Sequence, residues 1–314
     1  MPASTRHLLD PELLPLLDLL PPMEINAAGL PGLRRARDAA ITLGDPAEYG
    51  VQREEISVQS ADGTSISCLL YQPTAVTGTT AGYLHIHGGG YILGNAAGSD
   101  AANLVLCAKL GIVIVSVDYR LAPEFPIPKP LDDCYAGLAW LHEHAAELQV
   151  DRQRIGVGGE SAGGGLAAAL AIKARDAGEL TVCHQHLTYP MLDNLTGSET
   201  HPGDPLVGEF VWSRSLNQFG WAAYLGDAEP VAPQVPSRVN DYAGLPATWI
   251  HTVGLDLFRD ENIQYAQALM AAGVAVELVV MPGACHGFQM LPGTELGARY
   301  VAAHRAALAR GLKV

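Results

Sequence analysis

Three short stretches of the sequence carry residues that together could catalyse nucleophilic attack on an acyl group. The first reads Gly-Glu-Ser-Ala-Gly at residues 159–163, between an apolar run at 154–158 and an alanine-rich segment. A serine on a sharp turn from strand to helix is exposed at a sheet edge, and the free amides at the helix start face any oxyanion formed there. We therefore expect Ser161 to be a nucleophile, with an ordinary strand-to-helix loop as the alternative for this motif alone.

The second stretch reads His-Gly-Gly-Gly at residues 87–90, directly after an apolar segment. Consecutive glycines allow the backbone to approach a bound group closely, although a flexible turn has the same composition. The amides of Gly88 and Gly89, on a different strand from the serine, would join that of Ala162 in stabilising the oxyanion of a tetrahedral intermediate.

The third stretch supplies a base and the acid that orients it. His286 follows an apolar segment, and neutral imidazole on a loop is a ready general base. The chain order of serine, acid and histidine directs the search for the acid to the loop after the preceding strand. Asp256 is the predicted carboxylate and Asp260 the fallback, because Asp260 is better explained as charge at a helix start.

Alternating strand and helix patterns separate these stretches. Two alternating segments at 55–59 and 64–71, joined by Ala-Asp-Gly at 61–63, predict a hairpin. Six further strands are predicted at 83–87, 112–117, 154–157, 182–189, 248–252 and 276–280. Helices are predicted near 97–110, 131–147, 162–177, 259–272 and 294–310. The sequence therefore predicts an α/β fold with a mostly parallel eight-stranded sheet flanked by helices.

Composition excludes several other classes of protein. The 314 residues carry a formal net charge of −14, whereas nucleic-acid binding needs clustered Lys and Arg. Five scattered cysteines show neither a disulfide framework nor a zinc pattern. No apolar run reaches the roughly 20 residues of a membrane helix, and prolines and acidic residues among the first 22 positions do not fit a signal peptide. We expect a cytoplasmic protein with no nucleic-acid partner and no stable membrane insertion.

The motifs together resemble those of the bacterial hormone-sensitive-lipase-like esterases of the α/β-hydrolase superfamily. The resemblance rests on residues 87–90, 118–124, 159–164, 256–261 and 286–288, in matching order. It implies the α/β-hydrolase fold with a helical cap, Ser161 as nucleophile, His286 as base and Asp256 as its orienter. It also implies an oxyanion hole of Gly88, Gly89 and Ala162 and no cofactor. Two positions depart from the common family pattern: Leu257, where many members have proline, and Glu160, where aspartate is also common.

A cap is the second implication of the resemblance. Its parts would be an N-terminal helical arm at residues 1–50 and an insertion at 194–228, with the catalytic core at 51–193 and 229–314. Apolar side chains near the motifs predict a closed substrate pocket that would hold short- to medium-chain acyl groups. The predicted lining residues are Tyr91, Phe210, Trp212, Leu257 and Phe288.

The predicted function is a serine carboxylesterase that hydrolyses a small-molecule ester through a covalent acyl-enzyme. Hydrolysis of lactones or amides, acyl transfer, and non-catalytic ligand binding on the same fold remain alternatives, and a homodimer is left open. The His-x-His pairs at 85–87 and 184–186 have no acidic or cysteine partner at ligand spacing, so no metal site is expected. Arg120 is expected to form an ion-pair network with acidic neighbours, and Cys285 to be either a packed thiol or a site where oxidation disturbs His286.

Overall fold

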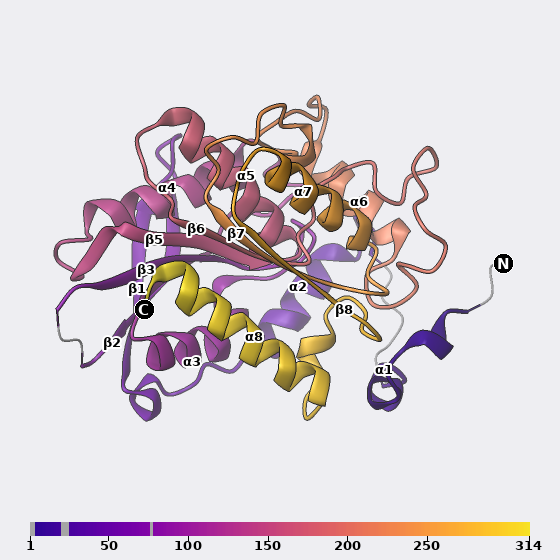
Figure 1. Ribbon diagram of the computed structural model, residues 1–314, viewed down its shortest axis with the longest axis horizontal. Helices are drawn as coiled ribbons and strands as arrows, with labels where there is room; N and C mark the ends of the chain where they lie inside the picture. The colour runs from indigo at the N-terminus through magenta and orange to yellow at the C-terminus, as the bar shows by residue number, and fades with distance from the viewer. Residues whose placement is uncertain (1–3, 20–24, 76–77) are drawn as a thin grey trace.

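One eight-stranded sheet runs through the molecule, and the computed structural model describes residues 4–19, 25–75 and 78–314 (Figure 1). The strand order is β1-β2-β4-β3-β5-β6-β7-β8. β1 pairs antiparallel with β2 and β2 antiparallel with β4, and every other pairing is parallel. The strands are β1 (Val51–Gln59), β2 (Ser65–Pro73), β3 (Thr80–Ile86), β4 (Val113–Val117), β5 (Val150–Glu160), β6 (His184–Thr188), β7 (Ala247–Val253) and β8 (Val276–Met281). The predicted mostly parallel sheet is confirmed.

Helices cover both faces of this sheet. In Figure 1, α4 (Lys129–Glu143), α5 (Ala162–Ala177) and α7 (Arg259–Ala271) lie above it, and α3 (Asp100–Leu110) and α8 (Glu295–Leu312) lie below it. Every residue of β3 is buried, which explains why that strand is apolar on both faces. Because parallel strands end at one edge, the loops after β3, β5, β6, β7 and β8 emerge together there.

The predicted helices and the hairpin are present, with shifted ends. β1 and β2 form the hairpin, and the Ser60 amide donates to the Thr64 carbonyl across the turn at 2.8 Å. The helix predicted at 131–147 spans Lys129–Glu143 instead, and residues 96–99 form a short 3-10 turn before α3. The strand predicted at 182–189 is only five residues long, from His184 to Thr188, and its register with β5 begins at His184.

In the described part of the chain, three further α-helices lie outside this set of sheet-covering helices. They are α1 (Leu14–Leu17) and α2 (Leu30–Ala39) from the N-terminal region and α6 (Arg214–Leu225) from the segment between β6 and β7. Figure 1 shows α1 and α6 at the same end of the sheet. The division of the chain into cap and core stays a prediction.

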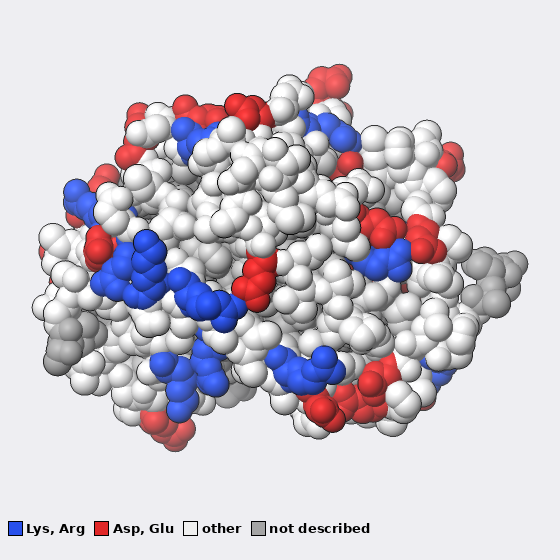
Figure 2. Space-filling view, viewed as in Figure 1, with Lys and Arg blue, Asp and Glu red and all other residues white. Residues whose placement is uncertain are grey.

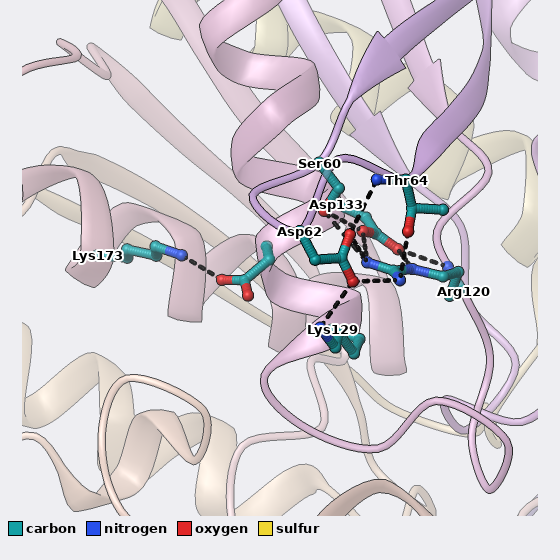
Figure 3. A network of polar contacts seen from close by, with 8 residues as sticks. Ser60, Asp62, Thr64, Arg120, Lys129, Asp133 and Lys173 are labelled. Atoms are coloured by element: carbon teal, nitrogen blue, oxygen red, sulfur yellow. Dashed lines mark hydrogen bonds and ion pairs between the residues drawn. The ribbon is translucent and has the colours of Figure 1, made fainter.

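The expected ion-pair network around Arg120 is present, but its acids come from elsewhere in the chain (Figure 3). The guanidinium contacts Asp133 of α4 at 2.6 Å and Asp62 of the hairpin turn at 2.9 Å. Ser60 also donates to Asp133, and Lys129 pairs with Asp62. The network therefore fastens the β1–β2 turn to the first turns of α4. The sequence neighbour Glu124 pairs instead with Arg34.

The face of the molecule in Figure 2 carries Lys and Arg in small groups interspersed with Asp, Glu and uncharged areas. Among the described residues, no helix is long and apolar enough to cross a membrane, and no group of three or more His, Cys, Asp or Glu is arranged to hold a metal ion. All five cysteines are free.

Candidate active site

The nucleophile turn is a strained link between a strand and a helix at the sheet edge. Ser161 lies between the last residue of β5 and the first of α5, with φ 56° and ψ −120°, a region that non-glycine residues rarely adopt. Gly159 and Gly163 flank it, and a Cβ on either would lie 2.0 Å from the carbonyl oxygen of Ile86. Only glycine permits this close approach of β5 and α5 to the end of β3, so the neighbouring backbone holds Ser161 in its strained conformation.

The predicted serine, histidine and aspartate meet in one chain of hydrogen bonds. His286 Nε2 lies 3.0 Å from Ser161 Oγ, and His286 Nδ1 lies 2.7 Å from Asp256 Oδ2. The other oxygen of Asp256 accepts from the Phe258 amide at 3.0 Å. The fallback acid Asp260 pairs with Arg259 at the start of α7, in the role expected for it. The loops after β5, β7 and β8 thus bring together residues 125 and 30 positions apart along the chain.

The three amides predicted for the oxyanion hole lie beside this chain. Gly88 packs against the nucleophile turn, since a Cβ on it would lie 3.4 Å from Ser161 Cβ. Gly89 has φ 127° and a Cβ there would collide with the Leu93 carbonyl, so this position also requires glycine. Among the described residues, no acceptor takes a hydrogen bond from the amides of Gly88, Gly89 or Ala162. They are free to bind an oxygen atom.

His87 anchors the glycine loop. Its ring stacks on Tyr119 with centroids 4.2 Å apart, and its Nδ1 donates to the Gly88 carbonyl at 2.9 Å. Burial lowers the pKa of His87 to about 4, so the ring is neutral at physiological pH. The neutral His87 ring, with its proton on Nδ1, donates a hydrogen bond to the glycine loop and adds no charge to the site.

Glu160, the residue before the nucleophile, pairs with a histidine of β3. Its carboxylate lies 3.4 Å from His85 Nε2, and His85 Nδ1 lies 3.0 Å from Ser116 Oγ. Burial alone would raise the pKa of Glu160, but the interactions with His85 and His304 and a backbone hydrogen bond together outweigh burial, so the net shift of the pKa is downward. Glu160 is therefore ionised, and its carboxylate faces His85 of β3.

Two aromatic residues that the sequence analysis did not single out contact His286. Tyr189 follows β6 directly, has φ 33°, and lies with its ring centroid 4.5 Å from that of His286. Phe258 contacts His286 edge-on at 5.4 Å. The sequence position of Tyr189, at the end of a predicted parallel strand, could have identified it as a site residue. The neighbouring strands end in the other site residues.

The five residues predicted to contact substrate differ in burial and in the residues that surround them. Tyr91 is buried between Tyr224 and Trp221, and its hydroxyl donates to the Met191 carbonyl. Phe288 is fully buried against His251 and Tyr300. Leu257 is buried beside Gly208, and Phe210 is partly exposed. The ring centroid of Trp212 lies 6.3 Å from that of His286. Substrate contact by these residues stays a prediction.

Cys285, adjacent to the histidine, is fully buried with Ala284 and Phe288. Burial raises the pKa of its thiol to about 12. Oxidation requires an accessible thiolate, so the packed thiol is the interpretation that the structure favours.

Comparison with known proteins places this architecture in a family. The profile described as alpha/beta hydrolase fold matches residues 83–290. The carboxylesterase NlhH of Mycobacterium tuberculosis is 35% identical over 292 residues, which are 91% of each chain. The ethyl acetate hydrolase of Pseudomonas putida is 31% identical over 76% of each chain. Among solved structures, a bacterial heroin esterase superposes with a TM-score of 0.88 and 38% identity over 98% of this chain and 99% of its own.

The sheet, its flanking helices and the matching profile define the class as α/β-hydrolase. Within that class, the chain belongs to the hormone-sensitive-lipase-like carboxylesterases.

Proposed function

We propose that this protein hydrolyses carboxylic esters with Ser161 as nucleophile, His286 as general base and Asp256 as the carboxylate that orients the base. The chain of hydrogen bonds at 3.0 and 2.7 Å supports this assignment, because each group lies within reach of the proton it must handle. Ester hydrolysis is also the reaction named for the family members that resemble this chain over most of its length.

The geometry suits a double displacement. His286 Nε2 removes the Ser161 proton as the oxygen attacks the ester carbonyl, and the amides of Gly88, Gly89 and Ala162 stabilise the resulting oxyanion. The tetrahedral intermediate collapses, His286 gives the proton to the leaving alcohol, and an acyl-enzyme remains. Water, activated by the same histidine, then releases the acid. This sequence of steps needs no cofactor.

The apolar surroundings of the site support a proposal for the substrate class. Trp212, Leu257 and the aromatic rings beside His286 leave few polar groups to hold a charged or sugar-like acyl chain. We infer esters of short- to medium-chain acids. The free state of all five cysteines supports a reducing compartment such as the cytoplasm.

A panel of p-nitrophenyl esters, with purified wild type and Ser161→Ala, tests the proposal. Wild type should turn over at least one ester and be inactivated by a serine-directed phosphonate, whereas folded Ser161→Ala should do neither, because alanine fits the turn and removes the nucleophile. Turnover near the wild-type rate in Ser161→Ala would exclude Ser161. Activity on lactones or amides alone would redirect the substrate class, and specific binding without turnover would favour a ligand-binding protein.

A further inference from the structure

The residues proposed for catalysis are buried, and Trp212 lies beside them. Ser161 is 6% exposed and His286 is 7% exposed. The Trp212 ring lies so close to the oxyanion loop that a Cβ on Gly90 would be 2.3 Å from it, and it also lies near His286. Trp212 therefore stands between the glycine loop and the histidine, where the leaving or acyl group of an ester bound to Ser161 has to fit.

The backbone that carries Trp212 is strained. Val211 has φ 63°, which is unfavourable for a β-branched side chain. The Trp212 amide donates to the Phe210 carbonyl at 2.7 Å, closing a three-residue turn around Val211 of the rare, strained hand. Such a turn persists only where its surroundings hold it. Val211 itself lies beside Gly287, the residue after His286.

Glu209, two residues before the strained turn, is held by the N-terminal arm, here defined as residues 4–18. Its carboxylate accepts three hydrogen bonds of 2.6 Å, from the Ser4 hydroxyl, the Thr5 hydroxyl and the Thr5 amide. Thr5 is only 3% exposed. Hydrogen bonds to a carboxylate are stronger than those between neutral groups, so these contacts fasten the segment before Trp212 from outside.

The N-terminal arm is itself fixed to the loop of the catalytic histidine. The Asp10 amide donates to the Gly283 carbonyl at 2.8 Å. The Glu12 carboxylate accepts from the amides of Glu295 and Leu296 at the start of α8. Leu9 and Leu13 are buried in the same cluster as Cys285. Glu209 is therefore bonded to a segment that is itself fixed to the body of the protein.

We propose that residues 208–212 form a gate over Ser161, that Trp212 limits the size of the ester admitted, and that Ser4 and Thr5 latch this gate through Glu209. The inference rests on the proposed function. One end of the gate is fixed by the Gly208 amide on the Leu255 carbonyl, beside Asp256. At the other end, the Trp212 indole nitrogen donates to Asn217 at 3.2 Å. The strain at Val211 favours opening, and the latch opposes it.

The test compares latch, gate and control variants of the full chain. Ser4→Ala with Thr5→Val removes both donor hydroxyls and keeps the size of Thr5. Trp212→Ala removes the gating ring. Asp18→Asn is the matched control, since it breaks the exposed Arg6–Asp18 ion pair of the same arm without touching Glu209. The measurement is the ratio of kcat/KM for p-nitrophenyl benzoate to that for p-nitrophenyl acetate, so that a general loss of activity cancels.

The latch double variant should raise this ratio about fivefold, the factor expected when side-chain hydrogen bonds that favour the closed state are lost. Trp212→Ala should raise it at least as much, and Asp18→Asn should leave it unchanged. Acrylamide quenching of the Trp212 fluorescence, obtained by difference from a Trp212→Phe background, should increase in the latch variant. An unchanged ratio and unchanged quenching in the folded latch variant would overturn the latch, and an unchanged ratio in Trp212→Ala would overturn the gate. If wild type hydrolyses neither ester, the proposed function fails, and quenching alone still decides whether the latch holds Trp212.

Discussion

The carbonyl oxygen of Ile86, at the end of β3, lies directly against Gly163 in the first turn of α5, and a Cβ on Gly163 would be 2.0 Å from it. No side chain, not even alanine, fits without a shift of backbone. This contact fixes the start of α5, and with it Ser161, relative to the glycine loop that follows Ile86.

Gly163→Ala should therefore lower both stability and activity. Overpacking of this kind costs about 1–3 kcal/mol, and the displaced turn should reduce kcat/KM at least about tenfold. Urea unfolding and ester turnover measure the two effects. Gly32→Ala is the control, because Gly32 lies in α2 with its nearest neighbouring atom 4.0 Å from a new Cβ; it should gain about 0.5–1 kcal/mol with unchanged turnover. Wild-type behaviour of Gly163→Ala would contradict the close contact.

The two acids after β7 should behave differently. Asp256→Asn removes the charge that orients and stabilises the His286 ring, and kcat should fall about a hundredfold or more. Asp260→Asn breaks only a partly exposed pair with Arg259 and should change kcat less than about threefold. Steady-state kinetics on one ester decides the assignment, which would be reversed if Asp260→Asn were the more damaging change.

The rate of ester hydrolysis should depend on pH because the proposed general base, His286, must be neutral to act. Only neutral imidazole accepts the Ser161 proton, so kcat/KM should rise from acid toward mildly alkaline pH. A profile with its maximum near about pH 4 would be incompatible with a histidine base. Chelators should leave the rate unchanged, and inhibition by a chelator that is reversed on adding zinc would point to a metal site.

Stability should fall in mild acid because histidines pack inside the fold. His184 and His251 are buried, and burial lowers the pKa of each to about 4. For His304 burial likewise lowers the pKa to about 4, outweighing the attraction of Glu160. The pKa of His186 is lowered further by burial and the neighbouring histidines. Since the unfolded chain binds protons near pH 6.5, this stability is complete above about pH 6.5 and is lost as pH falls toward about 4.

His251→Leu should reduce that acid sensitivity. Neither ring nitrogen of His251 has a hydrogen-bond partner among the described residues, so leucine sacrifices no such bond. The drop in unfolding free energy between pH 7.5 and pH 5.0, measured with urea, should shrink by about 2 kcal/mol. The exposed His201, replaced by asparagine, is the control and should leave the drop unchanged. An equal drop in both variants would exclude His251 as a contributor.

Acyl-chain length should be limited by the covered site. Each buried methylene contributes about 0.8 kcal/mol until space runs out, so kcat/KM should rise over the first carbons and then fall, with a preference for roughly two to eight carbons. Removal of residues 1 to 40 should weaken that preference, because the N-terminal arm holds Glu209. A series of p-nitrophenyl esters measures it, with circular dichroism confirming the fold. A truncated, folded enzyme with an unchanged preference would show that the arm does not shape the pocket.

Local patterns in the sequence were sufficient to predict the strands of the sheet, the helices that cover it and the motifs. Apolar runs, the Asp-Gly turn and the glycines around Ser161 are each encoded within a few residues, where backbone sterics and side-chain periodicity act. The chain order of Ser161, Asp256 and His286 also follows from the sequence, since parallel strands deliver the loops that follow them to one edge.

Contacts between distant segments were decided only by the tertiary structure. Arg120 has acidic residues beside it in the sequence, yet it pairs with Asp62, 58 positions away, because the hairpin turn folds onto α4. The same holds for Thr5 and Glu209, which are 204 positions apart. The type of a residue determines whether its side chain can donate or accept a hydrogen bond. Its partner depends on which surfaces the packed sheet and helices bring within about 3 Å of each other. A local sequence pattern does not encode that distance.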